Sequence, residues 1–227
     1  MRVLEMISTQ EEDWFRKFDP QKRILIGRAY LLAKRCMDLF LIVFTIPVWV
    51  PVTGIIALLI RITSPGAPVV FRQLRTGKGG RRFYMYKFRT MVPNAEELKP
   101  KYAYLNELQW PDFKITDDPR VTPIGRFLRR TSLDELPQLF NILLGEMSLV
   151  GPRPTSFGPE TYKLWHTHRL DAIPGLTGLW QITGRTQLEF DDRLRLDIAY
   201  LERASLWLDI NILVRTVIAV LQGRGAH

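Results

Sequence analysis

The feature that most constrains this chain is an uncharged apolar run that extends from Leu39 to Ile60. A membrane-crossing helix needs about 20 apolar residues, so a run of this length is a candidate for insertion into a bilayer. The buried helix of a soluble protein normally keeps a polar stripe, and this run has none. The run therefore predicts a segment that contacts lipid.

Two prolines, Pro47 and Pro51, interrupt the apolar run and predict a bend or a break there. Basic residues stand on both sides of the run, with Arg35 before it and Arg61 after it. Because basic residues mark the cytoplasmic side of a membrane segment, both ends are expected on one side. We predict a re-entrant helix hairpin over residues 31–61, broken at both prolines; a kinked single crossing is the alternative.

The remaining sequence divides into an N-terminal segment, residues 1–30, and one cytoplasmic catalytic domain, residues 62–227. Acidic residues precede any apolar run in the N-terminal segment, which is not typical of a secretory signal. We expect that segment to be flexible or to lie at the membrane interface. In the larger unit, the patterns predict short strands at 69–71 and 83–88 and helices at 96–107, 124–130 and 190–203. The expected fold class is α+β and mainly helical.

The chain carries a large positive charge. Lys and Arg number 32 against 23 Asp and Glu, which gives a net charge of +9. An excess of this size favours an anionic partner, such as nucleic acid, a phosphorylated ligand or acidic lipid. The single cysteine, Cys36, excludes an intrachain disulfide.

Two adjacent acids, Asp134 and Glu135, stand at the predicted start of a helix. Ser132 and Glu135 match a Ser-x-x-Glu capping box, and a helix dipole favours acids at this position without any further role. The arginines around them, including Arg129 and Arg153, favour a second interpretation. Two acids among arginines can hold Mg²⁺ and a diphosphate together, and a carboxylate can attack phosphorus directly.

Three further charged residues are candidates for the same site. Lys87 and Arg89 follow a predicted strand and form either a solvated face or a phosphate clamp. Asp197 lies on a helix of alternating charge, where a solvated ion pair is the commoner fate of an acid. The residues alone leave both alternatives open.

Several long motifs, in one order from about Lys34 to His227, closely resemble the bacterial sugar transferase family, the monotopic phosphoglycosyl transferases. The motifs are Lys-Arg-x-x-Asp at 34–38, Tyr-Lys-Phe-Arg-Thr-Met at 86–91, Ser-Leu-Asp-Glu-Leu-Pro-Gln-Leu at 132–139, Met-Ser-Leu-Val-Gly-Pro-Arg-Pro at 147–154 and Pro-Gly-Leu-Thr-Gly at 174–178. The resemblance implies a membrane-embedded α+β fold with a re-entrant hairpin. Many relatives break that hairpin at Ser-Pro, where this chain has Val50-Pro51, and Pro47 adds a second break.

The resemblance also implies a reaction, in which a hexose-1-phosphate moves from a UDP-sugar to undecaprenyl phosphate with release of UMP. By this likeness Asp134 is the nucleophile and Glu135 is a catalytic residue that binds Mg²⁺. Substrate-binding roles fall on the matching basic and acidic positions, which are Lys87, Arg89, Arg129, Arg153 and Asp197. The C-terminal blocks at 206–209 and 223–226 are similar to those of members that use glucose or galactose donors, and exopolysaccharide or another surface glycan is the expected product.

The same likeness implies a monotopic protein on the cytoplasmic face of the bacterial inner membrane, with membrane lipid, UDP-sugar and undecaprenyl phosphate as partners. Nucleic acid is not an expected partner, because the arginines cluster around an acid pair that would repel a phosphate backbone. A membrane-tethered nucleic-acid binder and an inactive scaffold of the same fold are the rival hypotheses. A homodimer is compatible with the sequence, although no pattern in it points to one.

Overall fold

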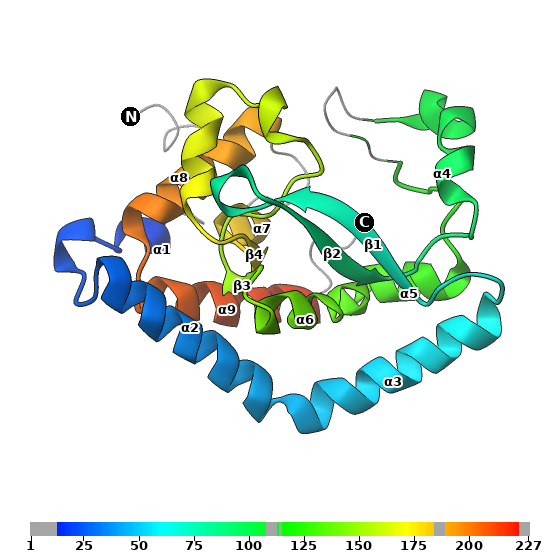
Figure 1. Ribbon diagram of the computed structural model, residues 1–227, viewed down its shortest axis with the longest axis horizontal. Coiled ribbons are helices and arrows are strands. Elements are labelled where there is room, and N and C mark those ends of the chain that lie inside the picture. The colour runs from blue at the N-terminus through cyan, green and yellow to red at the C-terminus, as the bar shows by residue number, and fades with distance from the viewer. Residues whose placement is uncertain (1–12, 108–112, 114, 184–188, 223–227) are drawn as a thin grey trace.

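The computed structural model describes residues 13–107, 113, 115–183 and 189–222, and it confirms a mainly helical α+β fold (Figure 1). Residues 1–12 of the N-terminal segment predicted over residues 1–30 lie outside the described residues. Its described part holds a short helix, α1 (Asp13–Arg16), and a 3-10 turn, η2 (Pro20–Lys22). Phe15 of α1 is buried in the main core, so this part of the segment packs on the rest of the protein.

The apolar run is divided between two helices, α2 (Gly27–Phe44) and α3 (Ile46–Thr63), which meet at Thr45 and diverge as an open V (Figure 1). The side chain of Thr45 donates to the Leu41 carbonyl at 2.7 Å, and the indole of Trp49 donates to the Ile42 carbonyl at 3.0 Å. The Trp49 bond satisfies a carbonyl group that the end of α2 leaves without a helical partner, and the Thr45 hydroxyl adds to the backbone N–H bond that the Leu41 carbonyl accepts.

The bend corrects one part of the sequence prediction. Pro47 lies in the first turn of α3, where a missing N–H costs no helical hydrogen bond. Pro51 lies inside α3, which continues through it, so the expectation of a break at Pro51 is wrong. Many relatives have a serine where this chain has Val50. In this protein the hydroxyl at the bend belongs to Thr45.

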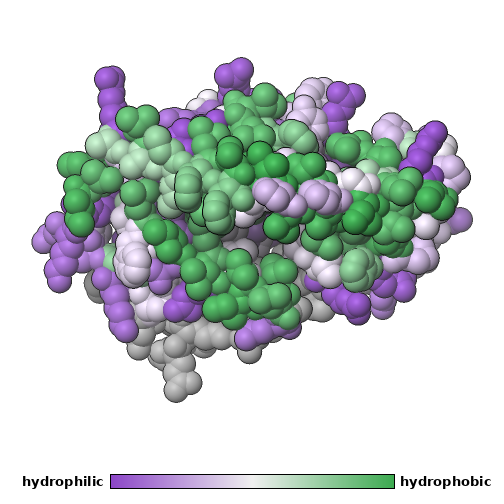
Figure 2. All heavy atoms as spheres, turned by 90° about the horizontal axis from the view of Figure 1, so that it is seen from below, coloured by the Kyte–Doolittle hydropathy of each residue, from purple (hydrophilic) through white to green (hydrophobic). Residues whose placement is uncertain are grey.

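Helix α3 is the one helix, within the described ranges, that is long and apolar enough to cross a membrane, and little of it is buried. Figure 2 shows that the underside of the molecule is mainly apolar. Figure 1 places α2, α3, α6 and α9 along this side. Exposed apolar side chains on these helices include Phe44, Val48, Leu58, Phe140 and Val217.

The strands form two separate pairs. β1 (Val70–Thr76) and β2 (Arg82–Phe88) make an antiparallel hairpin around the short turn η3 (Lys78–Gly80), as the sequence predicted. β3 (Ser148–Val150) and β4 (Gly175–Thr177) pair in parallel. A Cβ atom on Gly175 would lie 2.1 Å from the Gly151 nitrogen, so this close pairing requires glycine.

Helices surround these strands (Figure 1). Before β3 they are α4 (Ala95–Leu98), η4 (Pro100–Leu105), α5 (Pro123–Arg130), η5 (Leu133–Glu135) and α6 (Gln138–Leu143). After β3 they are η6 (Pro159–Thr161), η7 (Leu164–Asp171), α7 (Leu179–Thr183), α8 (Phe190–Arg203) and α9 (Leu206–Leu221). The predicted helix at 96–107 is thus divided before Pro100, because proline cannot donate to the preceding turn.

Two apolar clusters hold these elements together. The larger joins α2, β2, α6, β3, α8 and α9. The smaller packs Ile56 and Ile60 of α3 against Phe88 of β2 and Leu128 of α5, with Leu133 of η5 at its edge. The apolar helix therefore supports the turn that carries the two adjacent acids.

Candidate active site

Asp134 and Glu135 lie in the 3-10 turn η5, and the residue before this turn sets their direction. Ser132 has a left-handed backbone with a φ of 57°, and its side chain makes no capping hydrogen bond. The capping box predicted from Ser132 and Glu135 is therefore wrong, because an N-cap residue needs an extended backbone for its oxygen to reach the turn. Glu135 is free to bind other groups.

Lys87 and Arg153 hold the carboxylate of Glu135. Lys87 Nζ donates to Glu135 Oε1 at 2.8 Å, and Arg153 Nη1 donates to Oε2 at 3.3 Å while its Nη2 bonds Oε1. Burial alone would raise the pKa of Glu135, but Arg153 and Lys87 outweigh it and hold the pKa well below its usual range. Glu135 is thus a permanent anion at neutral pH.

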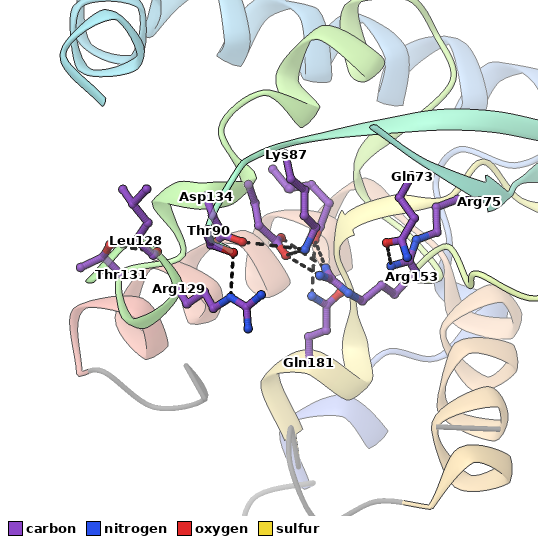
Figure 3. A network of polar contacts seen from close by, with 12 residues as sticks. Gln73, Arg75, Lys87, Thr90, Leu128, Arg129, Thr131, Asp134, Arg153 and Gln181 are labelled. Carbon is purple, nitrogen blue, oxygen red and sulfur yellow. Dashed lines mark hydrogen bonds and ion pairs between the residues drawn. The ribbon is translucent and has the colours of Figure 1, made fainter. Parts of the chain in front are cut away.

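Asp134 is buried beside this ion pair without sharing its bonds (Figure 3). Its Oδ2 lies 4.0 Å from Lys87 Nζ, and within the described part of the chain it makes no side-chain hydrogen bond. Burial raises the pKa of Asp134 above its usual range, and the charge of Lys87 opposes this only in part. The result is a carboxylate with few partners, close to a cation that favours its ionised form.

Arg153 is placed by the parallel strand pair. It follows β3 in the Gly-Pro-Arg-Pro turn, and its Nη1 donates to the carbonyl of Leu176 in β4 at 3.2 Å. Arg75 on β1 faces the same region (Figure 3) and donates to the carbonyl of Pro154 at 3.3 Å. Burial and the neighbouring Arg153 charge lower the pKa of Arg75 to about 10, so both guanidinium groups remain charged.

Arg129 approaches Asp134 from α5. Its Nε donates to the hydroxyl of Thr90 at 2.9 Å, a contact drawn in Figure 3. Burial lowers the pKa of Arg129, and the negative Asp134 opposes that shift. Arg129 therefore adds positive charge on the side of Asp134 away from Arg153.

Asp197 on α8 is buried, so the commoner fate of a solvated ion pair does not apply. Arg169 of η7 binds its Oδ2 through Nη2 at 2.6 Å and Nε at 3.0 Å. Burial raises the pKa of Asp197 to about 6, although Arg169 opposes the shift. Arg169 also donates to the Arg153 carbonyl, so Asp197 is linked through Arg169 to the backbone of the turn that carries Arg153.

One cavity of about 710 Å³ brings all of these groups together. Its lining includes all seven charged residues selected from the sequence, which are Lys87, Arg89, Arg129, Asp134, Glu135, Arg153 and Asp197. The lining also includes aromatic residues, among them Trp180 and Phe190. A polar cavity of this size is large enough for a nucleotide-sized ligand.

Comparison with known proteins identifies the family to which this sequence is similar. The sequence matches the bacterial sugar transferase family over residues 29–223. The chain belongs to this family. It is 42% identical over 202 residues to the galactosyl transferase CpsE of Streptococcus agalactiae, covering 87% of this chain and 44% of CpsE.

Two other members of the family show how the lengths compare. The undecaprenyl-phosphate galactose phosphotransferase of Salmonella typhimurium is 42% identical over 208 residues, covering 89% of this chain and 43% of that protein. The exopolysaccharide production protein ExoY of Sinorhizobium fredii is 36% identical over 215 residues, covering 92% of this chain and 95% of ExoY. The chain thus spans less than half the length of the first two relatives and nearly all of ExoY.

Two basic residues that line this cavity were missed from the sequence. Arg169 follows a His-Thr-His stretch with no periodic pattern, and Arg75 is one of several arginines along the β1 region. Each acquires its role from a contact with a residue far away in the chain, Asp197 for Arg169 and Pro154 for Arg75. Local spacing carries no signal for such a contact.

The acids also bear on the expected Mg²⁺. Within the described residues, no group of three or more His, Cys, Asp or Glu side chains is arranged to hold a metal ion. Magnesium commonly binds through one or two carboxylates and completes its shell with substrate phosphates and water. Asp134 and Glu135 therefore fit a cation that arrives with a diphosphate.

Proposed function

We propose that this protein transfers a sugar-1-phosphate from a UDP-sugar to a polyprenyl phosphate, with Asp134 as the nucleophile. The observation that carries the proposal is the buried, weakly bonded Asp134 beside Glu135, which is locked between Lys87 and Arg153 in one cavity. The relatives include proteins named as undecaprenyl-phosphate galactose and UDP-glucose:undecaprenyl-phosphate glucose-1-phosphate transferases. These names support the donor and acceptor classes.

In the first half of the reaction, a carboxylate oxygen of Asp134 attacks the phosphorus that carries the sugar. A new oxygen–phosphorus bond forms, the bond to the UMP oxygen breaks, and UMP leaves with the electron pair. Burial disfavours the ionised form of Asp134, and the charges of Lys87 and Arg129 favour it. Arg153 and Arg75 are placed to stabilise negative charge on the phosphates, which is the main electrostatic contribution expected in phosphoryl transfer.

In the second half, an oxygen of the acceptor phosphate attacks the same phosphorus. The Asp134 carboxylate leaves, and the product is a sugar joined to the lipid through a diphosphate. The cavity serves both halves, since the donor nucleotide departs before the acceptor attacks. Glu135 is a poorer nucleophile than Asp134, because hydrogen bonds from Lys87 and Arg153 withdraw charge from both of its oxygens.

Mg²⁺ is the expected cofactor, and Glu135 together with the donor diphosphate would hold it. A bound divalent cation would neutralise charge on the diphosphate and on the leaving UMP. Glu135 suits this role because its low pKa keeps it ionised.

We infer a monotopic placement on the cytoplasmic face of the inner membrane, with α2 and α3 entering one leaflet as a re-entrant hairpin. The apolar underside in Figure 2 and the bend at Thr45 support this placement. Lipid at this face would bring a membrane-bound acceptor to the cavity. Exopolysaccharide synthesis is the expected pathway, as the names of the ExoY relatives suggest.

Glucose or galactose is the expected donor sugar. Relatives named for galactose, glucose and N-acetylgalactosamine all share similar identity with this chain, so their names alone do not select one sugar. The cavity favours an enzyme over a nucleic-acid binder, because cations such as Lys87 and Arg153 bind carboxylates within it rather than forming an open basic surface.

A donor-only experiment tests the proposal. The detergent-solubilised protein is incubated with Mg²⁺ and each member of a UDP-sugar panel, without any lipid acceptor. We expect a stoichiometric burst of UMP and a peptide containing Asp134 that gains the mass of one hexose phosphate. Steady product formation on adding undecaprenyl phosphate, with no such adduct under any quenching condition, would contradict a covalent route.

A further inference from the structure

Arg89 is a buried cation with no charged partner among the residues that the structure describes. Its side chain is 92% buried, since 8% remains exposed, and Nη2 donates to the Ser64 carbonyl. In the described part of the protein, its Nε and Nη1 have no hydrogen-bond partner. Burying donor groups of a charged side chain without acceptors is costly. Such an arrangement in a cavity indicates an anion that binds there.

The place of Arg89 narrows the kind of anion. Ser64 is the residue at which α3 ends, so Arg89 lies where the apolar helix meets the cavity. Burial lowers the pKa of Arg89, and the charge of Arg61 in the last turn of α3 adds to the effect. The side of the cavity nearest to the apolar face therefore carries the positive charges of Arg89 and Arg61.

We propose that Arg89 binds the phosphate of the incoming lipid acceptor, a polyprenyl phosphate monoester. The charged guanidinium offers Nε–H and Nη1–H, which lie on different edges of the group, and each of them can donate to a phosphate oxygen. Arg89 stands two residues beyond Lys87 in the chain, about 7 Å along an extended strand. A phosphate held there lies near the region of Asp134, which Lys87 approaches to 4.0 Å.

Apolar residues next to Arg89 offer a path for the lipid chain. Phe71 lines the cavity, is partly exposed, and is the strand partner of Lys87. Val70 beside it and Ile62 in the last turn of α3 are also exposed. When the phosphate of the lipid is bound to Arg89, its first isoprene units can therefore lie over these side chains. The isoprene units then remain in contact with apolar groups. A nucleotide has no comparable apolar group.

The donor diphosphate has the same chemistry, so the test must separate the two sources. We compare Arg89→Gln with wild type by measuring KM for undecaprenyl phosphate in mixed micelles and, separately, KM for the UDP-sugar. We expect KM for the lipid to rise about 10-fold or more, the usual effect of losing a charged hydrogen-bonded pair. KM for the UDP-sugar should stay within about twofold.

Arg72→Gln is the matched control, because Arg72 is an exposed arginine on the same hairpin and does not line the cavity. It should leave both KM values unchanged. Equal rises in both KM values for Arg89→Gln, or no rise in either, would overturn the proposal. If Arg89→Gln lowers the melting temperature, Arg89→Lys replaces it and should show a smaller rise for the lipid alone.

This inference rests on the proposed function, and a binding measurement separates the two. Native mass spectrometry compares undecaprenyl phosphate with undecaprenol on wild type, Arg89→Gln and Arg72→Gln. Preferential binding of the phosphate that only Arg89→Gln loses would support the lipid-phosphate site even without turnover. Turnover with equal binding by all three proteins would reject the site and leave the proposed function standing.

Discussion

Two buried charged clusters of this protein differ in how completely their groups are paired. The anchor cluster, formed by Tyr30, Lys34, Tyr200 and Asp209, joins α2 to α8 and α9. Lys34 and Tyr30 donate to Asp209 Oδ2 at 2.8 and 2.9 Å, and Tyr200 donates to Oδ1 at 2.6 Å. Asp209 is completely buried, and both of its oxygens are bound.

The cavity is arranged in the opposite way. Asp134 lies at 4.0 Å from its nearest cation, and Arg89 keeps two donors without acceptors in the described part of the molecule. Buried polar groups are normally hydrogen-bonded, so such exceptions require an explanation. The comparison indicates that complete pairing fixes α2 to α8 and α9, while incomplete pairing leaves capacity for a ligand.

The sharpest test of this difference is Asp134→Asn. We expect activity to fall at least about 1,000-fold, because an amide cannot take the place of the attacking carboxylate. The melting temperature should stay equal or rise, because the raised pKa of Asp134 means that burial disfavours its charge. UMP release and thermal unfolding in detergent provide the two measurements.

Asp171→Asn serves as the control for this variant, because Asp171 ends η7 and does not line the cavity. It should keep wild-type turnover. If Asp134→Asn retained turnover, or unfolded at a much lower temperature, the proposed difference between the anchor cluster and the cavity would be contradicted.

The next largest effect is expected in the anchor cluster, from Lys34→Met. This change leaves Asp209 buried without its cation, and breaking a buried pair in this way costs about 3–5 kcal/mol. The melting temperature should therefore fall steeply, while turnover per folded molecule stays near wild type.

The double variant Lys34→Met/Asp209→Asn provides the matched comparison. The amide oxygen still accepts from one of Tyr30 and Tyr200, the amide N–H can donate to the hydroxyl of the other, and the unpaired charge is removed. Most of the lost stability should return. An equal loss in the single and the double variant would show that the ion pair is not what joins α2 to α9.

Much of the fold could be predicted from local pattern, and the errors have local causes. The helix at Phe190–Arg203 and the β1–β2 hairpin follow from periodicity and turn residues, and the structure confirms them. Strand β4 has no such local signal, because it is defined by its pairing with β3, which joins segments far apart in the chain. Pro51 was read as a break, although α3 continues through it.

The site divides in a similar way. The motifs selected Asp134, Glu135 and Arg153, and the structure brings them to one cavity. Helical charge pattern favoured a solvated Asp197, and only the fold shows that Arg169 buries it as an ion pair. The missing acceptors of Arg89 have no sequence signal, because they depend on what the fold leaves unpaired.

A smaller effect is expected from pH at Asp197. Its pKa is about 6 in the folded protein and near 3.9 in an unfolded chain, so folding is favoured by its protonated form. Stability contributed by this group is fully present below about pH 4 and is lost as pH rises through about 6. Wild type should thus lose up to about 2–3 kcal/mol relative to Asp197→Asn over this range.

Thermal unfolding of both proteins from pH 4 to pH 7 measures this difference. Asp192→Asn on the same helix is the control, because Asp192 is partly exposed and pairs with Arg195 at the surface. A difference between wild type and Asp197→Asn that stays constant with pH would mean that Arg169 keeps Asp197 ionised throughout.

The smallest expected effect on activity comes from loss of the hydrogen bond that holds Arg129 in the cavity. Thr90→Val removes the hydroxyl that accepts from Arg129 Nε and keeps the shape of the side chain. One such bond is worth about 1–2 kcal/mol, so kcat/KM for the UDP-sugar should fall roughly 5- to 30-fold. Thr131→Val is the control, because the Thr131 hydroxyl bonds only to backbone carbonyls of α5. Equal values for the two variants would show that Arg129 needs no fixed position.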